Sequence, residues 1–205
     1  MEKLFQSKLF SIILSVVIIV VAAISAIKLI TQVKPEVSID GEVLRTGMTV
    51  EDLAASGFSV GISMTGSGGL NLEVQPDVPA QTRSSTVYYI FKDGEYTNVS
   101  FGIYNNGKES CEFKDSRVCY YSCRFRFAFS DTEVLVNGID VGGMDKEDAI
   151  AAFEKLGVKF DTDDKDEFLN SEYGFIIGKS GEYSFELETD DDKKAIESIR
   201  VNRKV

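Results

Sequence analysis

The chain has 205 residues, of which 43% are hydrophobic, and this length suits one or two globular domains. Its 33 acidic residues outnumber 22 basic ones, and the resulting net charge of −11 argues against nucleic-acid binding, because the phosphates would be repelled. The chain contains no histidine, which removes the commonest general base, the usual nucleophile–histidine pairs and most zinc sites.

The first predicted element is a membrane anchor. Residues 9–27 carry no charge over 19 positions, and a helix of roughly 20 residues spans the ~30 Å hydrocarbon core of a bilayer. The sequence therefore predicts a cytoplasmic stub at residues 1–8, a transmembrane signal-anchor helix at residues 9–30 and a linker at residues 31–35.

The alternative for this segment is a cleaved signal peptide, since the small residues at Val21–Ala23 and Ile24–Ala26 are tolerable cleavage sites. The sequence leaves cleavage open. Long C-terminal domains translocate largely regardless of flanking charge. We therefore expect a single-pass protein of the cell membrane, held in the lipid bilayer by residues 9–30, with its N-terminus in the cytoplasm and the bulk of the chain outside it.

The chain then contains a tight turn that recurs later. Asp40-Gly41 follows an alternating apolar segment, and Asn137-Gly138 follows another. Asp-Gly and Asn-Gly favour type I′ hairpin turns, because both central residues of that turn need a positive φ. Both segments are therefore predicted to be β-hairpins.

A helix start follows each hairpin. Thr49 and Asp145 are good N-cap residues, and each is followed three positions later by an aspartate, Asp52 or Asp148. This is the spacing of a capping box, in which the cap and the third helical residue exchange hydrogen bonds. We predict a capping box at both helix starts.

The same helices share two further features: an apolar residue before the cap, called the staple, and a glycine after the last helical turn, called the stop. Met48 and Met144 precede the caps, and we expect both to be buried beneath their own helix starts. Gly57 and Gly157 follow the last helical turn, and each precedes an apolar residue. This pattern predicts a glycine in the left-handed conformation at the end of each helix.

Alternating apolar residues after each helix predict antiparallel strands. The predicted fold is α+β, with an N-terminal transmembrane helix followed by two tandem repeats, each made of a hairpin, one short helix and an antiparallel β-meander. Extracytoplasmic repeat 1 covers residues 36–130 and extracytoplasmic repeat 2 covers residues 131–205. The alternative is two unrelated units that look alike by chance.

The stretches GMTVEDL from Gly47 and GMDKEDA from Gly143 carry a family resemblance. They resemble the tandem helix-plus-meander modules of uncharacterised membrane-anchored surface proteins of Gram-positive bacteria, which are distantly similar to β-lactamase-inhibitor-like proteins and outer-membrane-assembly lipoproteins. The resemblance implies the fold and no catalytic residue. One feature departs from it, because the related lipoproteins begin at an acylated cysteine, whereas this chain begins with an apolar segment.

The cysteines are Cys111, Cys119 and Cys123. Cys119 and Cys123 lie four residues apart on a predicted strand, roughly 13 Å at ~3.3 Å per residue, which is too far for a disulfide. A hairpin around Asp115 would bring Cys111 opposite Cys119, so this pair is the candidate disulfide. Three buried, unpaired thiols are the alternative.

An acidic run occupies residues 161–172. Its spacing imitates a calcium-binding loop, but Lys165 stands at a ligand position and Asp166 replaces the glycine of the sharp turn. A weak cation site and a solvated loop both remain open. We predict no metal site and no cofactor.

These features together predict a membrane-tethered extracytoplasmic interaction module of the cell envelope, and not an enzyme. Its expected partner is an envelope protein or a basic partner, and its oligomeric state is not predicted. One alternative is a small hydrolase that uses paired carboxylates such as Asp163 and Asp166. Another is a purely structural acidic spacer.

Overall fold

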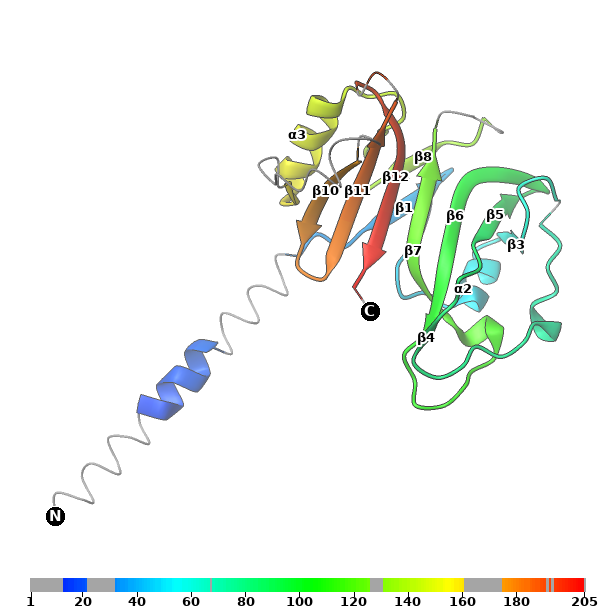
Figure 1. The fold of residues 1–205 in the computed structure, drawn as a ribbon, viewed down its shortest axis with the longest axis horizontal. Helices are drawn as coiled ribbons and strands as arrows, with labels where there is room; N and C mark the ends of the chain where they lie inside the picture. Colours follow the sequence, from blue (N-terminus) through cyan, green and yellow to red (C-terminus); the bar gives the residue numbers. More distant parts are fainter. Residues whose placement is uncertain are drawn as a thin grey trace, which may run out of the picture.

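The computed structural model describes residues 13–21, 32–66, 68–125, 131–160, 175–190, 192 and 194–204. The described fold is α+β (Figure 1), as predicted. Its helical elements are the helix of residues 13–21, α2 (Val50–Ala55), α3 (Lys146–Leu156) and the short 3₁₀ helices η1 (Leu72–Val74) and η2 (Phe113–Asp115).

The described part of the predicted anchor is the helix of residues 13–21, and the rest of residues 9–30 lies outside the described ranges. No helix within those ranges has both the length and the apolar character needed to cross a bilayer.

The strands form two antiparallel sheets. The small sheet has the order β2 (Glu42–Arg45), β1 (Glu36–Ile39), β8 (Val134–Val136). The large sheet has nine strands, in the order β3 (Ser59–Gly61), β5 (Tyr88–Lys92), β6 (Glu95–Asn105), β7 (Arg117–Arg124), β12 (Ile196–Arg203), β11 (Tyr183–Thr189), β10 (Phe175–Ser180), β9 (Lys159–Phe160), with β4 (Thr82–Arg83) also paired to β6.

The two predicted meanders are joined edge to edge. Strand β7 of the first half pairs with β12 of the second, with Tyr121 opposite Val201 and Cys123 opposite Ile199. This pairing satisfies two edges that would otherwise be exposed. The alternating apolar residues predict the meanders but not the pairing of one meander with the other.

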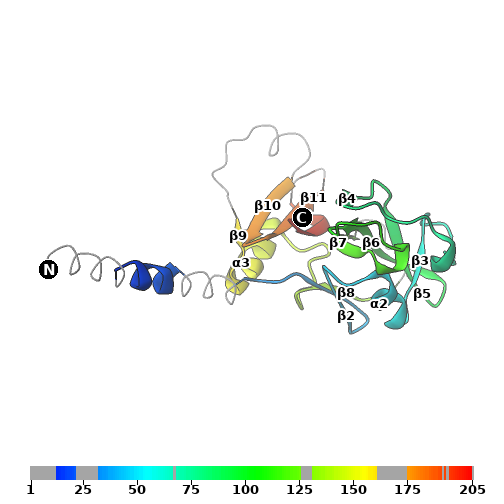
Figure 2. The ribbon, with the colours of Figure 1, turned by 90° about the horizontal axis from the view of Figure 1, so that it is seen from below.

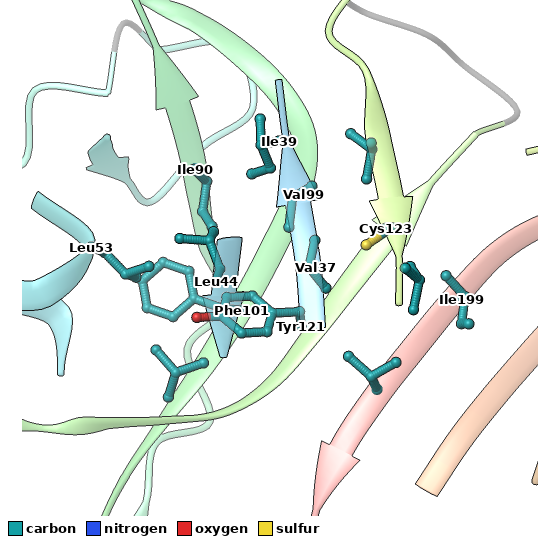
Figure 3. Packing of buried hydrophobic residues seen from close by; sticks show 14 of the residues in the cluster. Val37, Ile39, Leu44, Leu53, Ile90, Val99, Phe101, Tyr121, Cys123 and Ile199 are labelled. Carbon is teal, nitrogen blue, oxygen red and sulfur yellow. The ribbon is translucent and has the colours of Figure 1, made fainter. Parts of the chain in front are cut away.

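The small sheet also combines both halves, because β1 pairs with β8, with Val37 opposite Val136 and Ile39 opposite Val134. The helices α2 and α3 and the small sheet lie on one side of the large sheet (Figure 2). Between these layers lies one hydrophobic cluster with members from both halves, among them Val37, Tyr121 and Ile199 (Figure 3). The side of the large sheet away from this cluster is called the open face below.

Both predicted tight turns are confirmed, but only the first joins two paired strands, β1 and β2. After Asn137-Gly138 the chain makes a single bridge, Val136 with Ile139, and β8 pairs with β1 instead. Asp40 and Gly41 have φ of 47° and 86°, and Asn137 and Gly138 have φ of 51° and 75°. Positive φ at both central residues is the requirement of a type I′ turn.

The capping prediction holds for one helix only. At α2 the Thr49 side chain accepts a hydrogen bond from the Asp52 backbone N–H at 3.1 Å, and the Asp52 carboxylate accepts one from the Thr49 N–H at 2.8 Å. At α3 the Asp145 side chain makes no cap hydrogen bond, so the predicted second box is wrong. A reciprocal box there would bring two carboxylates, those of Asp145 and Asp148, close together, and like charges disfavour that approach.

The predicted left-handed glycines at the helix ends are confirmed, whereas the two methionines before the helices are less buried than predicted. Gly57 has φ of 86° and Gly157 has φ of 102°. Met48 and Met144 are half-buried rather than buried, although both pack against the hydrophobic cluster.

Both helix starts are tied to the large sheet by the same backbone hydrogen bonds. In each half, a glycine N–H donates to a strand carbonyl, and the carbonyl of the following methionine accepts from the N–H of the same strand residue. The distances are 2.7 Å for Gly47 N–Val118 O, 2.8 Å for Val118 N–Met48 O, 3.1 Å for Gly143 N–Ile196 O and 2.9 Å for Ile196 N–Met144 O.

Candidate functional site

The open face of the large sheet carries alternate side chains of its strands, because successive side chains on a strand point to opposite faces. On β11, the buried residues Tyr183, Phe185 and Leu187 alternate with the half-buried Ser184 and Glu186. The buried set belongs to the hydrophobic cluster, so the polar set lies on the open face.

Tyr120 lies across this open face. It stands on β7, directly opposite Gly102 of β6. A Cβ atom at Gly102 would overlap the Tyr120 ring, so the absence of a side chain at Gly102 gives the ring its place over β6.

Two arginines approach the same ring. The guanidinium carbon of Arg83 lies 5.1 Å from the Tyr120 ring centroid, and that of Arg200 lies 5.3 Å from it. Strand β4 carries Arg83 opposite Tyr104 of β6, and β12 carries Arg200 opposite Ser122 of β7. Both distances fall within the range of a cation–π interaction. We call Arg83, Tyr120 and Arg200 the arginine–tyrosine cluster.

One carboxylate borders the cluster. Asn202 donates a hydrogen bond from Nδ2 to Glu186 Oε1 at 2.6 Å, and Arg200 Nη1 lies 3.8 Å from Glu186 Oε2. Burial raises the pKa of Glu186 above its ordinary value, and the nearby charges of Arg200 and Arg83 oppose that shift. One carboxylate beside two guanidiniums leaves the cluster with an excess of positive charge.

The chemistry of the cluster is that of anion recognition. A guanidinium stacked on an aromatic ring keeps its N–H donors at its edge, where they match carboxylate or phosphate oxygens. Burial raises the pKa of Tyr120, so its phenol stays protonated at neutral pH. The described residues contain no group of three or more cysteines or acidic residues placed to hold a metal ion.

A hollow of about 300 Å³ adjoins Arg83. Its other lining residues include Gln81 and Asn105, whose side-chain amides donate to backbone carbonyls of the loop around Asn106 and Glu109. These amides hold the loop in shape, so Arg83 is the cation that the hollow offers to a ligand.

The predicted staple and stop residues lie elsewhere. Met48, Gly57, Met144 and Gly157 flank α2 and α3, on the covered side of the sheet, and they shape the scaffold. The arginine–tyrosine cluster was not predicted from the sequence. A signal was present in IRVNR, where Arg200 and Asn202 alternate with the apolar Ile199 and Val201.

The candidate disulfide between Cys111 and Cys119 is not formed, and all three cysteines are free thiols. Cys111 pairs its backbone with Val78, in both directions, at 2.8 and 3.1 Å. The 3₁₀ helix η2 follows Cys111, so the chain up to Cys119 does not fold as the expected tight hairpin. Burial raises the pKa of Cys123 to about 12, which keeps it a thiol.

The acidic run at residues 161–172, including Asp163 and Asp166 of the hydrolase alternative, lies outside the described residues. The structure therefore does not test the cation site or the carboxylate pair.

No family model, no curated protein and no solved structure matches the chain.

Proposed function

We propose that the chain is a membrane-tethered extracytoplasmic binding module of the cell envelope, without catalytic activity, that takes an anionic group on the open face of its large sheet. The observation that carries the proposal is the pair of guanidiniums on one tyrosine ring, at 5.1 and 5.3 Å. Their N–H donors suit a carboxylate or phosphate of an envelope component.

The proposed tether is the anchor at residues 9–30. Within its described part, the helix of residues 13–21, the isoleucine, leucine and valine side chains are 49% to 67% exposed. The helix lies away from both sheets (Figure 1). A helix that is apolar all round is stable where lipid or protein covers it, because exposure of so much apolar surface to water is unfavourable.

The proposed domain consists of two copies of one unit, at residues 36–130 and 131–205. The support is the recurrence of the turn, the glycine stop and the backbone bonds of each helix start. The cluster lies where the copies meet, since Tyr120 belongs to the first and Arg200 to the second. In this proposal, joining the two copies created the site.

The proposed ligand differs from the partner that the net charge favours. A chain with a net charge of −11 attracts basic partners at long range. At contact distance the local groups determine binding, and the cluster presents two guanidiniums beside one carboxylate. An anionic ligand therefore fits this surface better.

The test is calorimetric titration of the full chain, in nanodiscs of zwitterionic lipid, with inorganic phosphate. We expect binding by the wild type and a roughly tenfold loss of affinity in Arg83→Gln and in Arg200→Gln, because a hydrogen bond to a charged group contributes ~1.5–3 kcal/mol.

The matched control is Arg45→Gln. Arg45 is also exposed and also pairs with a glutamate, Glu36 at 2.7 Å, but it lies on the small sheet. We expect its affinity to equal that of the wild type. Absence of binding in the wild type, or equal losses in all three variants, would contradict the proposed anion site and favour the spacer alternative.

A further inference from the structure

The start of the folded domain is fixed against one end of the large sheet. The Val33 N–H donates to Ser180 Oγ at 2.8 Å, and the Lys34 carbonyl accepts a hydrogen bond from Asn137 Nδ2 at 2.9 Å. A Cβ atom at Gly181 would overlap the Gln32 side chain. The chain therefore enters the domain beside the β10–β11 turn, near the C-terminal end of α3 (Figure 2).

This end must lie at the membrane surface if residues 9–30 span the bilayer. Only residues 31 and 32 separate the proposed anchor from Val33, and an extended chain covers at most ~3.3–3.6 Å per residue. The β10–β11 turn is therefore held within roughly 10 Å of the end of the anchor, which is about the thickness of a headgroup layer.

The same end is rich in exposed lysines, which we call the lysine collar: Lys34, Lys155, Lys159, Lys179 and Lys204. The backbone N–H of Lys204 donates to the carbonyl of Glu182 in the β10–β11 turn, which places the end of β12 here as well. None of the collar lysines makes an ion pair within the described ranges.

The acidic groups that the structure describes at this end form no ion pair with a collar lysine. The carboxylate of Glu182 is paired with Arg203 at 3.2 Å, and Glu154 on α3 is exposed. The net charge of the chain is −11, so a group of five lysines at the point of chain entry, without ion pairs among the described residues, is opposite in sign to the chain as a whole.

Two collar residues face each other directly. Lys159 of β9 stands opposite Lys179 of β10. Like charges at directly opposed positions destabilise a sheet, and an anion that contacts both removes that repulsion. Leu156, 44% exposed beside Gly157, adds an apolar side chain to the same end.

From this geometry we infer that the lysine collar docks the domain onto the headgroups of anionic phospholipids. The inference rests on the proposed anchor. It adds that the attraction between the collar and anionic headgroups holds the domain against the bilayer and restricts its movement about the linker. Basic segments close to a membrane bind anionic lipid in the same way.

The test uses the full chain in vesicles, with an environment-sensitive label at Leu156→Cys in a Cys111→Ser background, and a second preparation labelled at Glu95→Cys on the far half of the large sheet. One vesicle set is phosphatidylcholine alone and the other contains phosphatidylglycerol; both carry the same headgroup-attached quencher. We expect several-fold stronger quenching of the Leu156 label in the anionic vesicles, loss of that difference at high salt, and no lipid dependence at Glu95.

The charge variant is Lys159→Glu/Lys179→Glu, which keeps a like-charge pair across β9 and β10 and so preserves the local strain. Its matched control is Lys146→Glu/Lys194→Glu, with the same change in net charge at the other end of α3 and β12. We expect only the collar variant to lose the lipid dependence.

Equal quenching of the wild type in both vesicle sets, or an equal loss of lipid dependence in the control variant, would overturn the docking inference. Neither result would contradict the proposed anchor. Failure of the wild type to float with either vesicle set would instead remove the anchor, and the docking inference with it.

Discussion

The substitution Gly57→Ala measures how much the left-handed glycine at the end of α2 contributes to the free energy of unfolding. Gly57 has φ of 86°, and a Cβ atom added there would meet no heavy atom within 4 Å. Steric overlap is therefore absent, and the expected loss comes from holding an L-residue in the left-handed region, on the order of 1 kcal/mol. Gly157, at φ of 102°, has its nearest neighbour at 3.6 Å, so Gly157→Ala is expected to lose about as much stability.

The matched control is Gly69→Ala. No heavy atom lies within 4 Å of a Cβ at this position either, and its φ lies outside the positive region. We expect Gly69→Ala to be neutral or slightly stabilising, because alanine restricts the unfolded chain more than glycine does.

The assay is urea unfolding of a fragment that begins at residue 32, followed by circular dichroism, since every member of the hydrophobic cluster lies at Val33 or beyond. For a domain of this size, 1 kcal/mol also corresponds to roughly 2–4 °C in Tm. If Gly57→Ala and Gly69→Ala unfold at the same urea concentration, the left-handed stop does not stabilise the helix as argued here.

Two further predictions use the same unfolding assay. Thr49→Ala should lose about 1 kcal/mol, whereas Asp145→Ala should lose less, because the Asp145 side chain makes no cap hydrogen bond; equal losses would contradict the single capping box. Burial raises the pKa of Glu186 in the folded state above its value of ~4.3 in the unfolded state. The protonated carboxyl therefore stabilises the folded state below pH ~4.3, and this stabilisation is lost as the pH rises through the folded-state pKa. The stability of Glu186→Gln relative to the wild type should therefore increase from acid to neutral pH, and a difference that stays constant or moves the other way would refute the assignment.

The parts of the fold that local geometry decides were predictable from the sequence. The Asp40-Gly41 and Asn137-Gly138 turns, the Thr49 cap and the Gly57 and Gly157 stops each depend on a few neighbouring residues, whose steric preferences and hydrogen bonds are the same in any fold. Two local predictions failed: the cap at Asp145, where a cap and its partner carry the same charge, and the full burial of Met48 and Met144, which are half-buried.

The pairing of distant strands could not be predicted from the sequence. Pairing of β7 with β12 joins Tyr120 to Asn202, and nothing in either segment specifies the other, because alternation fixes which side chains share a face and not which strand lies alongside. The arginine–tyrosine cluster depends on that pairing and on the absence of a side chain at Gly102, where the Tyr120 ring lies. The disulfide prediction failed for a related reason, since Cys111 pairs with the distant Val78.

The central claim is that Arg83 and Arg200 bind an anionic group at the open face. The most direct measurement is an NMR titration of the arginine side-chain Nε–H resonances with inorganic phosphate at constant ionic strength. The account predicts that the resonances of Arg83 and Arg200 shift together, with one affinity, while that of Arg45 stays in place. Resonances that do not move, or that move equally for all three arginines, would contradict it.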